Sequence, residues 1–374
     1  MNDRNKILII ENSIAITGSL QAVLRTSIAL RDKYEFIFIV PAKSQAAYLI
    51  TENKFKLYER SLYELNKSFT SILFYVPRLI RSAYHVKMIV QRERISIVHV
   101  NDFYNLIMPL CRLFGSRTCY LCSVNFVPSR FPFLLRKLWI GSHFLFSSKI
   151  VAVSNYVLKQ LPLHKKIVCI PDALPNVNIG QDTLVKKKEL LLFLGNFING
   201  KGQDLAIRAF ATFAPLYPSW KLKFVGGDMG LKKNKVYKSD LQNLSIKLGI
   251  EKQIEMTGFA RDVAREYCEA AISLNFSLSE SFSLTVQEAM FYGSPIIATR
   301  SGGPSELIED GYSGLLVPLN DIEKMSAAIQ FLINNPAERE RLKTNAALSI
   351  RERFHKSKTI DLLDQAYQDL LQNC

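Results

Sequence analysis

Two glutamates, Glu280 and Glu288, stand eight positions apart in the segment SESFSLTVQE at residues 279–288. A pair of carboxylates can carry out acid–base chemistry, and each carboxylate can also accept hydrogen bonds from the hydroxyl groups of a ligand. The same residues fit a capping box, in which Thr285 and Glu288 satisfy the first amides of a helix and Glu280 is only solvated. The pattern alone therefore leaves a ligand site and a helix cap as alternatives.

A helix is expected to begin near Ser283, directly after a buried strand. The backbone amides of Phe282, Ser283 and Leu284 would then lack intrahelical partners and point outward, which suits a diphosphate. Glu288 would lie one to two turns into the helix, where its carboxylate can accept both hydroxyls of a ribose. Glu280, in the preceding loop, would accept hydrogen bonds from the hydroxyls of a sugar. These residues would fit a sugar nucleotide, and on the pattern alone the helix cap stays open as the alternative.

A lysine in the segment GNFINGKG at residues 195–202 is a second candidate for catalysis. Lys201 follows a glycine-rich turn at the expected carboxyl end of a strand, where its ammonium can pair with a diphosphate and stabilise the charge of that group as it leaves. Preorganised cations at developing charge are often the largest contribution to catalysis. The alternative is an exposed lysine in a turn.

Two further candidates, His99 and Asp102, lie at the end of an expected strand in the segment ISIVHVND, residues 95–102. His99 could act in catalysis or orient an acceptor, and Asp102 could act as the base that activates the acceptor. A single histidine among apolar residues is more often a hydrogen-bonded group of the core. Both interpretations of His99 stay open at this point.

The elements that must position these residues alternate between strand and helix. Apolar runs with polar boundaries predict the strands, and apolar residues at helical spacing predict the helices between them. Such alternation is typical of parallel sheets with helices on both faces, where ligands bind at the carboxyl ends of the strands. The expected strands lie at residues 6–11, 34–41, 95–102, 118–124 and 149–154, and at residues 189–197, 220–227, 253–259, 271–277 and 295–300.

The length of 374 residues exceeds what one hydrophobic core usually supports, so two domains are expected. Residues 171–189 are rich in Pro, Asn, Asp and Lys and lack periodicity, as in a connector between domains. We therefore expect two Rossmann-like, doubly wound α/β domains, at residues 1–176 and 177–355. A final helix at residues 356–374 is expected to cross back to the first domain.

The net charge of +15 is concentrated in the first half of the chain. Residues 1–180 hold 24 Lys and Arg against 10 Asp and Glu, which gives +14, whereas residues 181–374 hold 24 against 23, which gives +1. Basic residues alternate with large apolar ones at 71–90 and 126–146, a mixture that suits contact with an anionic membrane surface. A solvated basic face is the alternative, and the sequence has no motif of a nucleic-acid-binding protein.

No apolar run approaches the roughly 18–20 residues that span a bilayer. The N-terminal sequence MNDRNKILIIENS also lacks the features of a signal peptide. The expected location is the cytoplasm, with peripheral association at the inner face of the cytoplasmic membrane.

Four motifs follow one another in the order and spacing seen in family 4 glycosyltransferases. The motifs are GNFINGKGQDLAIRAF (195–210), TGFARDVAREYCEAA (257–271), SLSESFSLTVQEAMFYGSPIIATRSGGPSEL (277–307) and GYSGLLVP (311–318). This resemblance, strongest over about residues 150–320, implies the GT-B fold, with two Rossmann-like domains facing each other across a cleft. It also implies transfer from a nucleotide sugar with retention of anomeric configuration.

The resemblance implies donor-site roles for the residues already named and for several others. Lys201 and Glu280 would act on the diphosphate and the sugar, and Glu288 would bind the ribose. The further donor-binding candidates are Gly18 (in the loop after the first strand), Gly195, Asn196, Phe259, Phe282, Ser283 and Leu284.

The chain departs from the family pattern at two positions. Family members usually have an arginine in place of Asn196, and many have a histidine in place of Asn125. A neutral amide can donate a hydrogen bond to a phosphate but supplies no charge, so one to two decades of binding or rate could be lost. Arg261 or Lys232 could compensate for the missing arginine.

The sequence thus predicts a retaining transferase that moves a sugar from a UDP-, GDP- or TDP-sugar to a lipid-linked saccharide in surface polysaccharide assembly, such as lipopolysaccharide O-antigen, capsule or exopolysaccharide. No Asp-x-Asp motif is present, and we expect transfer without a metal or cofactor because Lys201 and helix amides would take the metal's role. The alternatives are an epimerase of the same fold, a non-catalytic nucleotide-sugar-binding protein and a dehydrogenase, although no GxGxxG follows the first strand.

Overall fold

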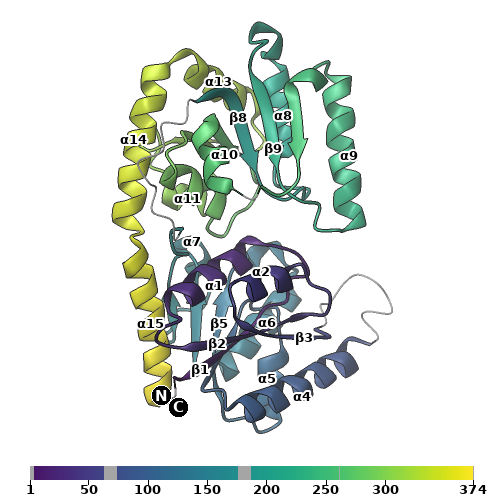
Figure 1. Cartoon of the computed structure of the whole chain (residues 1–374), viewed down its shortest axis with the longest axis vertical. Helices are drawn as coiled ribbons and strands as arrows, with labels where there is room; N and C mark the ends of the chain where they lie inside the picture. Colours follow the sequence, from purple (N-terminus) through teal and green to yellow (C-terminus); the bar gives the residue numbers. More distant parts are fainter. Residues whose placement is uncertain (1–3, 63–73, 176–186, 261, 374) are drawn as a thin grey trace. The chain divides into compact units, whose positions relative to one another are not determined.

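The computed structural model describes the chain except for residues 1–3, 63–73, 176–186, 261 and 374 (Figure 1). The described residues form two units. We call Met1–Ala173 with Lys356–Cys374 the N-terminal unit, and Leu174–His355 the C-terminal unit. Most of the expected connector at 171–189, namely residues 176–186, lies outside the described residues.

The N-terminal unit contains a seven-stranded parallel sheet in the order β3-β2-β1-β4-β5-β6-β7. Its strands are β1 (Lys6–Ile10), β2 (Glu35–Pro41), β3 (Lys56–Arg60), β4 (Ile97–Val100), β5 (Cys119–Val124), β6 (Lys149–Ala152) and β7 (Ile167–Cys169). Its helices are α1 (Gly18–Ala29), α2 (Ala46–Glu52), α4 (Tyr75–Glu93), α5 (Ile107–Leu113), α6 (Phe133–Phe146), α7 (Asn155–Leu158) and α15 (Lys356–Asn373). The apolar runs form the central strands, because a parallel sheet is buried on both faces.

The last helix, α15, belongs to the N-terminal unit, where it packs into the core beside β1 and β2. Leu363, Ala366, Tyr367 and Leu370 are its buried apolar residues. Polar contacts fix the helix at its edges: the hydroxyl of Tyr34 donates to Asp364 over 2.7 Å. A last segment with apolar residues at helical spacing thus completes a core made by the first 170 residues.

The C-terminal unit contains a six-stranded parallel sheet in the order β10-β9-β8-β11-β12-β13. Its strands are β8 (Lys188–Leu194), β9 (Lys221–Val225), β10 (Ile254–Thr257), β11 (Ala270–Asn275), β12 (Ile296–Thr299) and β13 (Leu315–Val317). Its helices are α8 (Gln203–Ala211), α9 (Lys232–Lys247), α10 (Val263–Glu269), α11 (Leu284–Phe291), α12 (Pro304–Leu307), α13 (Ile322–Asn334) and α14 (Pro336–Arg353). The two sheets confirm the expected pair of α/β domains.

Each sheet has one place where the direction of winding reverses: between β1 and β4 in the first, and between β8 and β11 in the second. At such a switch point the loops after the two strands diverge and leave room for a ligand at the carboxyl ends. The loops after β8 and β11 carry Lys201 and Glu280. The topology of the second sheet therefore brings these two candidates to one place.

Among the described residues, no helix combines the length and apolar character needed to cross a membrane.

Candidate active site

Helix α11 begins where the sequence predicted. Its N-cap residue is Ser283, which has a left-handed backbone with φ of 84°, and Leu284 is its first residue. Thr285 therefore lies inside the helix, and its hydroxyl accepts a hydrogen bond from Asn275 Nδ2 over 2.9 Å. The capping-box alternative is wrong for this reason. The amides of the first turn have no intrahelical acceptors, which leaves the helix start suited to an anion.

Phe282 contributes its backbone and not its ring to this helix start. The ring is buried and packs edge-to-face on Phe354, with 5.6 Å between centroids. The loop of Gly302 and Gly303 lies against the backbone of Phe282: a Cβ at Gly303 would come within 2.3 Å of the Phe282 carbonyl oxygen. The absence of a side chain at Gly303 thus lets the loop of Gly302 and Gly303 pack closely against the backbone of Phe282.

Lys201 and Glu280 form an ion pair, with 2.7 Å between Nζ and Oε1. The hydroxyl of Ser277 donates to the same oxygen of Glu280 over 2.7 Å. The backbone of Glu280 is fixed as well, because its amide donates to the Ser301 carbonyl and its carbonyl accepts from the Gly303 amide, both over 2.9 Å. The side chain and the backbone of Glu280 are thus both held, whereas the contact of the Lys201 ammonium is the one with Glu280.

The backbone around Lys201 is fixed against the end of β11. The amide of Leu278 donates to the Gly200 carbonyl over 2.9 Å. Gly202 has a left-handed backbone with φ of 88°, and a Cβ there would come within 2.1 Å of the Phe276 carbonyl oxygen. Only glycine fits this close approach, so the glycine-rich turn places Lys201 beside the loop of Glu280.

Glu288 lies on α11 and is buried, with 4% of its surface exposed. A buried carboxylate is stable only when hydrogen bonds satisfy its oxygens. The side chain of Glu280 is the more accessible of the two, at 11% exposure. Glu280 and Glu288, which stand eight positions apart in the sequence, thus differ in how deeply they are buried.

Asn196 ties two loops of the C-terminal unit together. Its side-chain oxygen accepts a hydrogen bond from the Gly227 amide over 3.2 Å, and the Phe197 amide donates to the Gly227 carbonyl over 2.9 Å. A Cβ at Gly226 would come within 2.0 Å of the Gly195 carbonyl oxygen, so the loops after β8 and β9 touch. Asn196 therefore positions backbone at this edge of the sheet.

Phe259 covers the same loop, since a Cβ at Gly227 would come within 2.3 Å of its ring. The ring is 47% exposed and presents an apolar face to solvent. Of the two basic residues that could replace the missing arginine, Lys232 is the exposed first residue of α9, and Arg261 lies outside the described residues.

In the N-terminal unit, His99 is a satisfied core group. Its Nε2 bonds to the Ser123 hydroxyl and its Nδ1 to the Tyr367 hydroxyl, both over 2.7 Å. Burial lowers the pKa of His99 to about 3, so the ring is neutral at physiological pH. This geometry favours the structural interpretation of His99, because both ring nitrogens are already engaged.

Asp102 is also buried, and its Oδ1 accepts from the amides of Phe103 and Asn125 over 2.7 and 3.4 Å. The side chain of Asn125 donates to Asn101 Oδ1 over 2.9 Å. Gly18 is the first residue of α1, which Thr17 caps through a hydrogen bond from the Leu20 amide over 3.3 Å. Asp102, Asn125 and Gly18 thus all lie in loops or at a helix start near the carboxyl ends of the strands of the first sheet.

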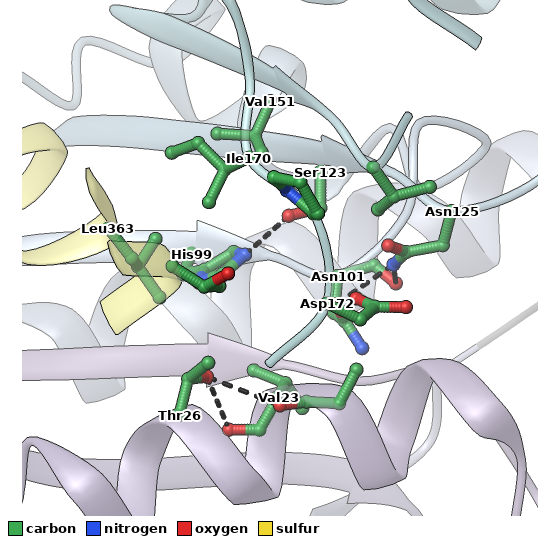
Figure 2. A pocket seen from close by; sticks show the side chains of 14 residues that line it. Val23, Thr26, His99, Asn101, Ser123, Asn125, Val151, Ile170, Asp172 and Leu363 are labelled. Carbon is green, nitrogen blue, oxygen red and sulfur yellow. Dashed lines mark hydrogen bonds between the residues drawn. The ribbon is translucent and has the colours of Figure 1, made fainter. Parts of the chain in front are cut away.

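His99 lines a small cavity of about 40 Å³ inside the N-terminal unit, together with the polar residues Asn101, Ser123, Asn125 and Asp172 (Figure 2). Of these, Asn101, Ser123 and Asp172 were not singled out from the sequence. Partial burial raises the pKa of Asp172 to about 7. Asn101 also donates to Glu11 at the end of β1. The signal available in the sequence was their position: Asn101 and Asp172 follow apolar runs, and Ser123 is a polar residue near the end of one.

The C-terminal unit carries a cation and a carboxylate on the loops that follow β8 and β11, and a second carboxylate and a helix N-terminus on α11. Such a set can bind a diphosphate and hydroxyl groups. Residues 177–349 match the family Glycosyl transferases group 1. The C-terminal unit therefore contains a glycosyl transferases group 1 domain.

Several curated proteins are similar to this part of the chain over part of their own length. An uncharacterized glycosyltransferase of Haemophilus influenzae is 32% identical over 164 residues, which are 43% of this chain and 44% of that protein. A D-inositol 3-phosphate glycosyltransferase of Acidothermus cellulolyticus is 32% identical over 188 residues, 49% of this chain and 41% of that protein. The matches thus span less than half the length of these curated relatives.

The fold of the whole chain is similar to solved glycosyltransferase structures. The Anabaena protein HepE, in complex with UDP and glucose, matches with a TM-score of 0.82 over 98% of this chain and 100% of that chain, at 17% identity. The sheet topology and this similarity establish the GT-B fold.

Proposed function

We propose that this protein is a retaining family 4 glycosyltransferase, which moves a sugar from a nucleotide sugar to a lipid-linked saccharide in surface polysaccharide assembly. The observation that carries the proposal is the Lys201–Glu280 pair beside the start of α11, within a glycosyl transferases group 1 domain. A cation and free helix amides at one switch point provide two features that a sugar diphosphate needs.

In this proposal the diphosphate lies over the amides of Ser283 and Leu284, and Glu288 binds the ribose. The ammonium of Lys201 moves from Glu280 toward the phosphates, where it stabilises the negative charge that develops as the diphosphate leaves. Glu280, held by Ser277, keeps its place and accepts hydrogen bonds from the sugar. Lys201 and the helix amides together supply the electrostatic stabilisation, so no metal is required.

The proposed acceptor is a saccharide on a lipid carrier at the inner face of the cytoplasmic membrane. Support comes from the excess of basic residues in the first 180 positions. Each basic residue near an anionic surface contributes about 1 kcal/mol of binding, so five or six are enough to hold a protein there. The expected location is therefore the cytoplasm, with peripheral attachment to the membrane.

A screen of thermal unfolding against UDP-, GDP- and TDP-sugars tests the donor half of the proposal. One class of nucleotide sugar is expected to raise the midpoint of unfolding, and the Glu288→Ala variant is expected to lose most of that increase. A protein whose midpoint moves with none of these compounds would not bind a nucleotide sugar.

The main rival is an epimerase of the same fold, which would consume the donor without an acceptor. Incubation with donor alone separates the two activities: an isomer of the donor sugar indicates an epimerase. The transferase is expected to release nucleotide slowly without acceptor and quickly when membrane lipids are added.

A further inference from the structure

A groove of about 790 Å³ lies between α6 and the segment that begins with α7, entirely within the N-terminal unit. Its volume falls in the range of sites that bind small organic molecules. Residues from both sides line it: Ser129, Phe133, Arg136, Lys137, Ile140, Gly141, Phe144, Tyr156, Lys159, Gln160, Leu161 and Pro162. None of these residues belongs to the proposed donor site.

The lining is apolar along α6 and at the opposite wall. Phe133, Ile140 and Phe144 follow one another at helical spacing, and Leu161 and Pro162 lie across from them. Phe133 is 56% exposed although it is a large aromatic residue. An apolar trough of this kind can bind a hydrocarbon chain, since burial of apolar surface is favourable.

The charged residues of the groove are all basic. The ammonium of Lys137 lies 4.4 Å and the guanidinium carbon of Arg136 5.5 Å from the centre of the Phe133 ring. Lys159 adds a third cation from the opposite wall. The sequence from residue 103 to residue 171 contains no acidic residue that could neutralise them. An anionic group is therefore the matching ligand for this end of the groove.

The surface of α6 next to the groove is apolar as well. Leu134, Leu138 and Leu145 are 79%, 55% and 72% exposed. Exposed leucines beside basic residues are typical of a helix that lies in the interface of a membrane. The groove thus lies beside a surface of the N-terminal unit that is suited to lipid.

We propose that this groove binds one lipid phosphate, with its phosphate at Arg136, Lys137 and Lys159 and the first carbons of its chain along Ile140 and Phe144. The identification of a membrane lipid as the source rests on the proposed function, whereas the groove itself does not. In this role the groove would hold the carrier of the acceptor, and not only attach the protein to the bilayer.

Gly141 offers a way to close the groove without disturbing the fold. It lies in the middle of α6 and lines the groove, and a Cβ added there would meet no atom within 4 Å. Leucine is a far better helix former than glycine. Gly141→Leu is therefore expected to fill the groove and leave the helix intact.

Titration calorimetry of the full chain with farnesyl phosphate, below its micelle concentration, tests the proposal. Farnesol, which has the hydrocarbon chain without the phosphate, and inorganic phosphate, which has the anionic group without the chain, are the control ligands. We expect farnesyl phosphate to bind with a stoichiometry of one, at least tenfold more tightly than either. If farnesol bound as tightly as farnesyl phosphate, the role of the basic residues would be overturned. If inorganic phosphate bound as tightly as farnesyl phosphate, the role of the apolar wall would be overturned.

Variants locate the binding. Gly141→Leu, and separately the double change Lys137→Glu with Lys159→Glu, are each expected to weaken farnesyl phosphate at least tenfold. Lys235→Glu, at an exposed position on α9 in the C-terminal unit, is the matched charge control and is expected to bind like the parent. Unchanged binding in both groove variants would show that the lipid phosphate binds elsewhere.

The same measurement is independent of sugar transfer. A protein that binds farnesyl phosphate in the groove but transfers no sugar refutes the proposed function and keeps the groove. A protein that transfers sugar to a lipid acceptor equally well after Gly141→Leu keeps the function and refutes the groove.

Discussion

Lys201 and Glu280 come from the loops after β8 and β11, and their side chains meet with 2.7 Å between Nζ and Oε1. The lysine side chain is 35% exposed and the glutamate 11%. Because the lysine end of the pair is partly exposed, solvent screening keeps its contribution to stability small, at about 1 kcal/mol or less. Its importance is therefore in ligand binding: Glu280 is fixed by Ser277 and by its own backbone, so Lys201 can exchange its partner for a phosphate.

Lys201→Ala is expected to lower kcat of transfer by roughly 10²–10³, the range seen when one preorganised donor at a developing charge is removed. The unfolding midpoint is expected to change little, because the ion pair is partly exposed. Steady-state kinetics and thermal unfolding measure the two effects. A variant that retains kcat within threefold of the parent would exclude Lys201 from the chemistry.

Glu288→Ala and Glu280→Ala are expected to differ in what they impair. In the proposed role, loss of Glu288 would remove two charge-assisted hydrogen bonds to the ribose, each worth about 1.5–3 kcal/mol, and is expected to weaken binding of the bare nucleotide at least tenfold. Loss of Glu280 is expected to leave nucleotide binding nearly unchanged and to lower discrimination between sugars and the rate of transfer. Calorimetry with the nucleoside diphosphate and the nucleotide sugar found in the thermal screen separates the two, and equal effects of both variants on the nucleoside diphosphate would contradict the assignment.

Gly303→Ala is expected to disturb the start of α11, because the new Cβ would come within 2.3 Å of the Phe282 carbonyl oxygen. The backbone of the site must then shift, and the binding of nucleotide sugar is expected to fall by more than tenfold. Gly258→Ala is the matched control, since a Cβ there meets nothing within 4 Å. If both variants bound donor equally, the contact between the glycine loop and Phe282 would not matter for the site.

His99 is expected to influence stability and not the pH profile of activity. Its pKa of about 3 in the folded state lies below the usual 6.5, so the unfolded chain takes up a proton first as the pH falls below 6.5. Through His99, the free energy of unfolding therefore decreases as the pH falls below 6.5, by at most about 1.4 kcal/mol per pH unit. Urea unfolding of the parent and of His99→Gln at pH 7.0 and 4.5 measures this contribution.

The raised pKa of Asp172 acts in the opposite direction, because the folded state then holds the proton and its contribution is lost as pH rises toward 7. The contribution of Asp172 is present in both the parent and the His99→Gln variant, so it cancels when their free energies of unfolding are compared. The parent is expected to lose about 2 kcal/mol more than His99→Gln between the two pH values. Parallel losses would mean that His99 titrates normally in the folded protein.

Transfer is expected to persist in the presence of EDTA, because in the proposed mechanism Lys201 and the amides at the start of α11 stabilise the diphosphate. The measurement compares initial rates with excess EDTA, with Mg²⁺ and with Mn²⁺. Activity that EDTA abolishes and either metal restores would overturn metal-independent transfer.

The central strands and the start of α11 were predictable because each has a strong local signal. Buried parallel strands are continuous apolar runs, and α11 follows such a run at Ser283. The strands β3, β7 and β13 were not predicted: they lie at the edges of their sheets, and β7 and β13 have three residues each. Edge strands are short and partly exposed, so their apolar pattern is weak.

Tertiary contacts decided the roles that the sequence left open. His99 is a core residue because Ser123 and Tyr367, which are 24 and 268 positions away, engage both of its nitrogens. Asn196 positions a loop because Gly227 is placed beside it by a neighbouring strand. Neither contact leaves a signal near the residue itself. Two motifs at strand ends did indicate Lys201 and Glu280 as donor-site candidates, but the ion pair between them was not predicted.

The central claim is the transfer of sugar from a nucleotide donor to a lipid-linked acceptor. The most direct measurement incubates the protein with radiolabelled UDP-, GDP- or TDP-sugars and membrane lipids, and then follows the label into the lipid fraction. We expect label from one donor to reach the lipid, and the Lys201→Ala and Glu288→Ala variants to reduce it strongly. A label that stays in the nucleotide fraction with every donor, or that appears there only as an isomer of the donor sugar, would contradict the account.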